Sequence, residues 1–343
     1  MSTAIRLLQI SVGLAISGVA LYLALRGVHW PEVRSALGEA DYSLVLLAAV
    51  LLIGVLVLRS LRWRLLFHPD ANPRIDNLFG SLNVGYLINN LVPLQVGDVG
   101  RAYVLSELEG VSTTRSLSTV VVERILDVFT LLLLLLALVP FLDIPSWSTA
   151  PAAFIALVFT GLTGALVLAA WRRQAMLALV ERLLRLVPSR SRPKLGQMAA
   201  SALDGFAILT RPLTALGLVA FSTGTWLCAA VVVYLGTRAF DLGVGFDAAV
   251  LLIVATSFGF FVPSSPGAFG VYHAIAIGTL TSAFDVDRNA AISYALVIHL
   301  VFYLPPVFIG SAFLLRRREL WRGTSLAQKL RELRGESLLP REV

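Results

Sequence analysis

Two stretches, NNLVPLQVGDVGRAY at residues 89–103 and FFVPSSPGAFGVYH at residues 260–273, share one pattern of helix-breaking residues. In each, a Pro stands four residues before a Gly, and another Gly follows three residues later. The copies are Pro93, Gly97, Gly100 and Pro263, Gly267, Gly270. Pro and Gly interrupt helices and free backbone polar groups, which hydrocarbon cannot satisfy. Paired breaks in the two halves of a membrane protein are typical of a transporter with a binding site between them.

The background of these breaks is strongly apolar. The chain has 343 residues, of which 57% are hydrophobic and 14% charged, and its mean hydropathy is +0.81. This balance is typical of a polytopic membrane protein. A bilayer-spanning helix needs roughly 20 apolar residues. We expect six such helices, at about residues 5–25, 42–61, 116–138, 151–171, 214–236 and 290–313. The first is expected to be retained, because its apolar run is too long for a signal peptide.

The broken segments, 77–107 and 248–283, supply no clean uninterrupted span. We predict that each forms a re-entrant helical hairpin. Span, hairpin and span then occur twice with opposite orientation, in a first repeat at about 42–138 and a second at about 214–313. The predicted fold class is therefore an all-α polytopic membrane protein with six transmembrane helices and two re-entrant hairpins in inverted repeats. The alternative is that both segments are ordinary spans kinked by Gly and Pro.

The formal net charge of +7 is distributed unevenly along the chain. Lys and Arg gather in those segments between spans that would lie on one side of the membrane. Arg62 and Arg64 belong to such a segment, because they follow the expected span at 42–61. Positive charge of this kind marks the cytoplasmic side, so we expect a multi-pass protein of the cell membrane with both termini cytoplasmic. The membrane domain would be 1–315, with a cytoplasmic connector at 172–210 and a basic tail at 316–343. Nucleic acid is not an expected partner, because this asymmetry accounts for the charge.

Ionisable residues concentrate near the first break. Glu123, Arg124 and Asp127 lie within one expected span, where each costs roughly 2.5–3.5 kcal/mol on insertion scales, so they need partners or a wet cavity. We expect Arg101 and Arg124 to present guanidinium forks to a phosphate while the carboxylates hold them in place. The alternative is an internal salt-bridge network that fixes the packing of the helices. Asp98 has a further alternative role as the N-cap of a half-helix.

The second break is surrounded by neutral polar residues, including His273. His299 and Tyr303 lie four residues apart on the last expected span, so they can face the same cavity. A lone intramembrane His is also explained by packing or an interhelical hydrogen bond. We predict a single cavity between the hairpins. The predicted substrate-binding residues are Asn90, Pro93, Gly97, Asp98, Arg101, Glu123, Arg124, Asp127, Pro263, Gly267, Gly270, His273 and His299.

Sequence motifs of enzymes are missing. The chain contains no HExxH, GxSxG or GxxxxGK[ST] motif, and no GxGxxG motif on a strand. Cys228 is its only cysteine, and it has four histidines. We therefore predict no catalytic residues, no cofactor and no metal site.

Four segments together resemble the transmembrane domain of lysylphosphatidylglycerol synthase and its stand-alone, flippase-like relatives. They are RSLRWRLLF at 59–67, NNLVPLQVGDVGRAYVL at 89–105, VVVERILDV at 120–128 and PSSPGAFGVYHA at 263–274. The resemblance covers roughly residues 5–315. It implies a lipid-translocating membrane domain with two re-entrant hairpins. Family members fused to an aminoacyltransferase domain make and then flip aminoacylated phosphatidylglycerol. We expect this chain not to synthesise the lipid, because that domain is absent.

The match is not complete at three positions. Asp98 stands where the family usually has Glu, His273 where many members have Glu, and Ala268 where many have a second Gly. The expected function is a flippase for an anionic or polyprenyl-linked lipid, and the expected partners are membrane lipids. Two alternatives remain open: a membrane-embedded lipid-modifying or glycosyl transferase component, and an accessory subunit of such an enzyme.

Overall fold

The computed structural model describes residues 15–24, 26–92, 96–141, 161, 172–185, 192, 196, 211–260 and 264–317. Pro93 and Pro263 of the predicted site lie outside the described residues. So do nearly all of the expected span at 151–171, most of the connector and nearly all of the basic tail.

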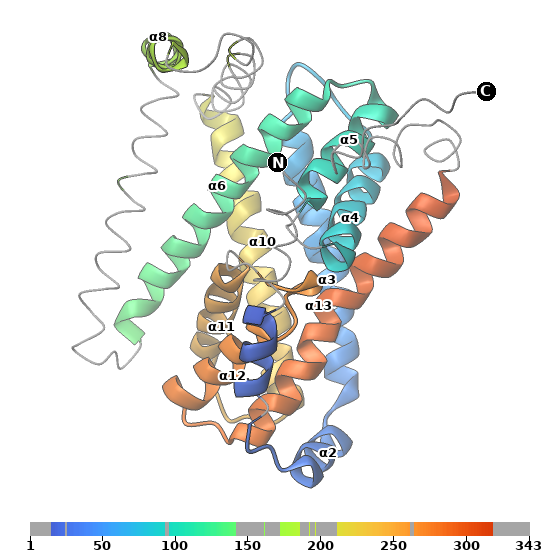
Figure 1. Cartoon of the computed structure of the whole chain (residues 1–343), viewed down its shortest axis with the longest axis vertical. Helices are drawn as coiled ribbons and strands as arrows, with labels where there is room; N and C mark the ends of the chain where they lie inside the picture. The colour runs from blue at the N-terminus through green and yellow to red at the C-terminus, as the bar shows by residue number, and fades with distance from the viewer. Residues whose placement is uncertain are drawn as a thin grey trace.

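The described part of the chain is helical throughout (Figure 1). A short apolar helix, Ala15–Ala24, comes first. The α-helices that follow are α2 (Trp30–Glu39), α3 (Tyr42–Leu65), α4 (Ile75–Leu91), α5 (Gly97–Glu109), α6 (Thr113–Leu138), α8 (Arg173–Leu184), α10 (Pro212–Ala239), α11 (Phe246–Gly259), α12 (Val271–Ala283) and α13 (Arg288–Arg316). Two 3-10 helices, η1 (Val139–Phe141) and η3 (Pro266–Ala268), complete the set.

Three of these helices, α3, α10 and α13, are long and apolar enough to cross a membrane. Each covers a span expected from the sequence. Their outward faces carry large exposed apolar side chains, such as Leu46 on α3, Leu216 on α10 and Phe308 on α13. Helix α6 covers a fourth expected span and has 26 residues. Several long apolar helices of this kind are consistent with a polytopic membrane protein.

Aspartate side chains fix the start of two spans. Asp41 caps α3 by accepting a hydrogen bond from the Ser43 amide (2.9 Å), and Asp287 caps α13 by accepting from the amides of Asn289 and Ala290 (2.9 and 3.0 Å). Such caps satisfy amides that have no partner within the helix. The Ser43 hydroxyl and then the Ser43 amide lower the pKa of Asp41, so this cap stays ionised at neutral pH.

Both broken segments form pairs of short helices, as the sequence predicted. Helix α4 packs against α5, and α11 packs against α12. These helices have 17, 13, 14 and 13 residues, fewer than the roughly 20 needed to span a bilayer. Figure 1 shows α4 and α5 toward one end of the molecule and α11 and α12 toward the other, with α3, α10 and α13 running between them. Each broken segment is therefore a pair of short helices, and the re-entrant placement of these pairs stays a prediction.

A close backbone contact positions the first break. Gly97, the first residue of α5, packs against the carbonyl of Gly85 on α4, and a Cβ at Gly97 would collide with it. The Gly97 amide donates a hydrogen bond to Asn89 Oδ1 (2.7 Å). The start of α5 is therefore tied to the end of α4, and the side chains that follow Gly97 have a defined direction.

The helix Ala15–Ala24 packs on the second break. The Ser265 amide donates a hydrogen bond to Ser17 Oγ (2.6 Å), and Gly270 contacts the Ser17 carbonyl with a φ of +87°. Arg288 of α13 donates to two carbonyls at the end of the same helix, those of Leu23 and Ala24 (2.8 and 3.1 Å). This helix therefore covers the break between α11 and α12.

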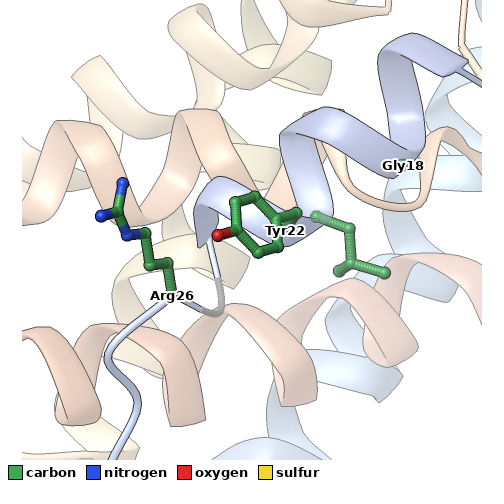
Figure 2. Close-up of a pocket in the computed structure, with 4 residues that line it drawn as sticks. Gly18, Tyr22 and Arg26 are labelled. Atoms are coloured by element: carbon green, nitrogen blue, oxygen red, sulfur yellow. The ribbon is translucent and has the colours of Figure 1, made fainter.

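A surface hollow lies along the same helix, and Figure 2 shows Tyr22 with its hydroxyl directed toward the side on which Arg26 lies. The hollow is lined by Gly18, Leu21, Tyr22 and Arg26. None of these residues belongs to the predicted site.

Candidate functional site

The ionisable residues near the first break form one connected cluster, which we call the arginine network. It joins α3, α5 and α6 through ion pairs. Its members are Arg59, Arg62, Asp98, Arg101, Glu123, Arg124 and Asp127.

Arg62 of α3 is the centre of the network, and its side chain is fully buried. Its Nη1 donates to Asp127 Oδ1 (2.7 Å) and to Ser222 Oγ (3.1 Å), and its Nη2 lies 3.2 Å from Glu123 Oε1. Glu123 and Asp127 are four residues apart on α6, so they lie on one helix face and both reach the same guanidinium. The arginine thereby pairs with two carboxylates whose charges hydrocarbon would not tolerate.

Arg101 of α5 extends the network toward the first break. Its Nη1 donates to Glu123 Oε2 (3.1 Å), its Nε lies 3.1 Å from Asp98 Oδ1, and its guanidinium lies over the Trp63 ring at 4.9 Å. Its side chain is buried, and the Nη2 atom has no hydrogen-bond partner within the described residues. An unused donor beside the break has capacity for a further acceptor.

Arg124 and Asp98 form the open edge of the network. Arg124 donates from Nε to Asp98 Oδ2 (2.9 Å) and from Nη2 to Asp98 Oδ1 (2.8 Å), which is the bidentate geometry typical of strong arginine pairs. The Arg124 side chain is 38% exposed and that of Asp98 28%, whereas the other side chains of the network are at most 10% exposed. The network can be reached from outside at this pair.

Asp127 connects the network to α10. Trp226 donates from its indole nitrogen to Asp127 Oδ1 (3.0 Å), and Arg59 Nη1 lies 3.6 Å from Asp127 Oδ2. The Arg59 guanidinium lies 4.9 Å from the centre of the Trp226 ring and donates to the Tyr86 hydroxyl (3.1 Å). Asp127 therefore accepts hydrogen bonds from side chains of two other helices, α3 and α10.

The network does not balance its own charges. Four guanidinium groups meet three carboxylates, so the network carries one net positive charge when all of them are ionised. An uncompensated charge in a low-dielectric environment is costly. The arrangement favours an additional anion, and Arg124 is the accessible place for it.

A second group, the histidine cluster, surrounds the second break. It consists of Phe269, Tyr272, His273, His299 and Tyr303. The rings of His273 and His299 lie 4.8 Å apart between centroids, and Tyr272 stacks on His299 at 4.6 Å. His299 Nε2 lies 2.9 Å from the Gly267 carbonyl, so this nitrogen is the donor. The Nδ1 atoms of both histidines are buried without a partner in the described structure.

The two breaks meet at one residue of α13. The Tyr303 hydroxyl donates to the Asn90 carbonyl at the end of α4 (3.4 Å), and the Tyr303 ring lies against Gly267. Helix α4 also contacts η3 directly. The two breaks therefore lie next to each other.

Comparison with known proteins shows the family of this chain. Residues 10–310 match the family described as the lysylphosphatidylglycerol synthase TM region. The chain belongs to this family. The match covers most of the sequence, and the chain is a multi-pass membrane protein.

Relatives with curated descriptions come from archaea. Two are described as UPF0104 membrane proteins of Methanothermobacter thermautotrophicus. One is 25% identical over 86% of this chain and 90% of its own length, and the other is 28% identical over 77% and 83%. A third, the glycosyltransferase AglD of Haloferax volcanii, is 31% identical over 37% of this chain and 20% of its own length.

The structure divides the predicted substrate-binding residues into two groups. Asp98, Arg101, Glu123, Arg124 and Asp127 come together in the arginine network. Gly267, His273 and His299 belong to the second break, and within the described residues neither histidine forms a hydrogen bond or ion pair with an arginine of the network. Gly97 and Asn90 lie beside the first break, and Gly270 lies beside the second. The single cavity that would contain all of them stays a prediction.

Two interpretations from the sequence were wrong. Arg62 does not lie in a loop on the cytoplasmic side, as its place after the expected span at 42–61 had predicted. Helix α3 continues to Leu65, and the Arg62 guanidinium is buried. Asp98 is not the N-cap of α5, because Val96 occupies that position without a side-chain cap and the Asp98 carboxylate binds Arg101 and Arg124 instead.

Sequence reasoning also missed Arg59 and Trp226 as members of the site. One signal was available, since Arg59 and Arg62 are three residues apart and share a face of an apolar helix. Within the described residues, no group of three or more His, Cys, Asp or Glu side chains is placed to hold a metal ion.

Proposed function

We propose that this chain is a lipid translocator that moves a lipid with an anionic headgroup, such as a phospholipid or a polyprenyl-linked lipid, across the cell membrane. The observation that carries the proposal is the arginine network, a buried cluster with one net positive charge and one half-exposed guanidinium at Arg124. Arginine forks match the oxygen spacing of phosphate groups. A headgroup phosphate would pair with the guanidinium of Arg124 at the exposed edge of the network.

The helix arrangement supports a pathway at this position. Short helices interrupted by non-helical backbone are tolerated at membrane depth where protein or a water-filled cavity surrounds them. We propose that the α4–α5 and α11–α12 hairpins are re-entrant and related as inverted repeats, with both termini on the cytoplasmic side. Transporters of that design place their substrate between the repeats, near the membrane midplane. The contacts of Tyr303 with both breaks fit this placement.

Lipid exchange between leaflets tests the proposal directly. The full chain would be reconstituted in liposomes that carry a fluorescent phosphatidylglycerol or a fluorescent polyprenyl phosphate, and the fraction accessible to a membrane-impermeant quencher would be followed over time. We expect faster exchange than in protein-free vesicles, and a loss of that gain for Arg124→Gln. Exchange equal to that of empty vesicles for every lipid would refute the proposal.

A second candidate is a component of a membrane-embedded lipid-modifying or glycosyl transferase. It is favoured by the local similarity to the protein named glycosyltransferase AglD. Lipid extracts of a deletion strain separate the two functions. A missing lipid species would favour the transferase component, whereas a normal lipid composition with altered exposure in the outer leaflet would favour translocation.

A further inference from the structure

We propose that Asp98 is a displaceable counterion, which occupies the place of the substrate phosphate on Arg124 and must leave it when substrate binds. The proposal rests on the proposed function and adds the means by which the same site is kept closed. It also names the ligand class, a lipid with a singly charged phosphodiester.

The first step is the geometry of the pair. Asp98 uses both carboxylate oxygens on the Nε and Nη2 atoms of Arg124 (2.9 and 2.8 Å). Two oxygens of a phosphodiester present the same pattern of acceptors to a guanidinium fork. In the structure, the fork that a headgroup would use is therefore already filled by a side chain of the protein.

The second step is the exposure of the pair relative to its neighbours. Asp98 and Arg124 are the two members of the network with appreciable exposure, while Arg62, Arg101 and Glu123 are buried. Asp98 and Glu123 each pair with two arginines, but the Asp98 side chain is 28% exposed, so water can solvate its carboxylate when it turns away from Arg101 and Arg124. The Glu123 side chain is fully buried and has no comparable exit.

The third step is the charge balance. The network has one positive charge in excess when Asp98 is counted as a member. A phosphodiester carries one negative charge, as the Asp98 carboxylate does, so exchanging one for the other leaves the charge of the network unchanged, whereas a phosphomonoester carries up to two negative charges at neutral pH. The buried remainder of the network keeps its own pairs in either state, since Arg101 retains Glu123 and Arg62 retains Asp127.

The fourth step links displacement to the hairpin. Asp98 is the second residue of α5 and follows Gly97, whose amide binds Asn89 and whose backbone packs on Gly85. Movement of the Asp98 side chain therefore acts on the point where α4 and α5 are held together. Substrate binding is thereby coupled to the first break.

The test measures lipid binding and transport on the same preparations of the full chain. The variant is Asp98→Asn, which keeps the shape of the side chain but removes its charge. Asp76→Asn is the matched control, because Asp76 is an exposed carboxylate of α4 that pairs with Arg74 and Arg317 outside the network. The probe is phosphatidylglycerol, with retention by detergent-solubilised protein followed by native mass spectrometry, and with soluble glycerophosphoglycerol or inorganic phosphate as competitor.

We expect Asp98→Asn to bind phosphatidylglycerol about tenfold more tightly, because Arg124 no longer has to be released by an internal competitor. Transport should fall, because the headgroup has lost the group that displaces it. Asp76→Asn should match the wild type in both. Glycerophosphoglycerol should compete with the lipid, and equal competition by inorganic phosphate would overturn the assignment to a phosphodiester.

A purely structural role predicts a different result, in which Asp98→Asn lowers thermal stability, binding and transport together, and that result would overturn the inference. If the variant does not fold, a density map of the unmodified protein in phosphatidylglycerol nanodiscs decides the question. A headgroup on Arg124 with Asp98 turned away supports displacement, and a headgroup elsewhere with the Asp98–Arg124 pair intact refutes it. Failure of the proposed function is distinguishable, because wild-type protein would then show no Arg124-dependent lipid binding or exchange.

Discussion

The two breaks share one Pro-Gly pattern but differ in the chemistry around them. The first break leads directly into Asp98 and Arg101, which pair with Glu123 and Arg124. The second is surrounded by neutral aromatic and imidazole rings, and its contact to the helix Ala15–Ala24 is made by serine and glycine. The backbone pattern sets the position of each break, whereas the side chains decide what it can bind.

This difference assigns separate tasks to the two hairpins. The first carries Asp98 and Arg101 and lies against the accessible guanidinium of Arg124 on α6, so we expect it to take part in recognition of an anion. The second offers a packed group of rings held by the hydrogen bond between His299 and the Gly267 carbonyl, and we expect it to close the proposed pathway. Variants that act on one hairpin and spare the other test this division.

The largest effect is expected from Arg62→Ala, which removes the centre of the arginine network. Glu123 and Asp127 would be left buried without their main partner, and breaking a buried ion pair in this way costs about 3–5 kcal/mol. We expect a sharp loss of thermal stability and of folded protein in the membrane. Arg64→Ala is the control, because Arg64 lies two residues later on α3 and binds the exposed Asn72. Equal stability of both variants would contradict a central role for Arg62.

A smaller but more specific effect separates Arg101 of the first hairpin from Arg124 of α6. In Arg124→Lys the charge remains but the planar fork is lost, so transport should fall by about tenfold, equivalent to about 1.4 kcal/mol, with near-normal melting. In Arg101→Lys the change lies in a buried side chain that also stacks on Trp63, so melting should fall as well. Thermal unfolding and lipid exchange, measured on the same preparations of both variants, test this difference between Arg124 and Arg101. Normal transport by Arg124→Lys would favour a purely structural network.

The sequence predicted the parts of the site that depend on local pattern. The Pro-Gly breaks predicted that each broken segment forms two short helices, and helix geometry places Glu123 and Asp127, which are four residues apart, on one face of α6. Arg124 and Asp127, three residues apart, also meet, at 3.7 Å. These features follow from helix geometry alone.

The rest depends on contacts between helices that are distant in the sequence. Arg62 and Ser222 are 160 residues apart, and Asp127 and Trp226 are 99 apart, so no local spacing relates them. The rule that positive charges gather at the cytoplasmic side placed Arg62 in a loop, whereas the residue lies within α3. A rule that accounts for a charge at a helix end does not show whether the helix continues past it.

For the second hairpin, we expect a moderate effect from Gly270→Ala. The φ of +87° disfavours any side chain, and a Cβ would meet the Ser17 carbonyl, so the cost should be about 1–3 kcal/mol. Gly278→Ala is the matched control on α12, where a Cβ meets no atom within 4 Å. That variant should be neutral or more stable by up to about 1 kcal/mol. Equal melting temperatures for the two variants would argue against tight packing of the helix Ala15–Ala24 on this break.

The smallest effect is expected where the two hairpins meet. Tyr303→Phe removes one hydroxyl whose hydrogen bond to the Asn90 carbonyl is long (3.4 Å), while the ring can keep its place against Phe269 and Gly267. Stability should change by less than about 1 kcal/mol. Tyr42→Phe removes a hydroxyl that donates to the Leu37 carbonyl (2.8 Å) at a distant, exposed position, and serves as the control. If the hairpins act separately, lipid exchange by the two variants should be the same within error. A loss of exchange confined to Tyr303→Phe would instead show that this one bond transmits binding at the first break to closure at the second.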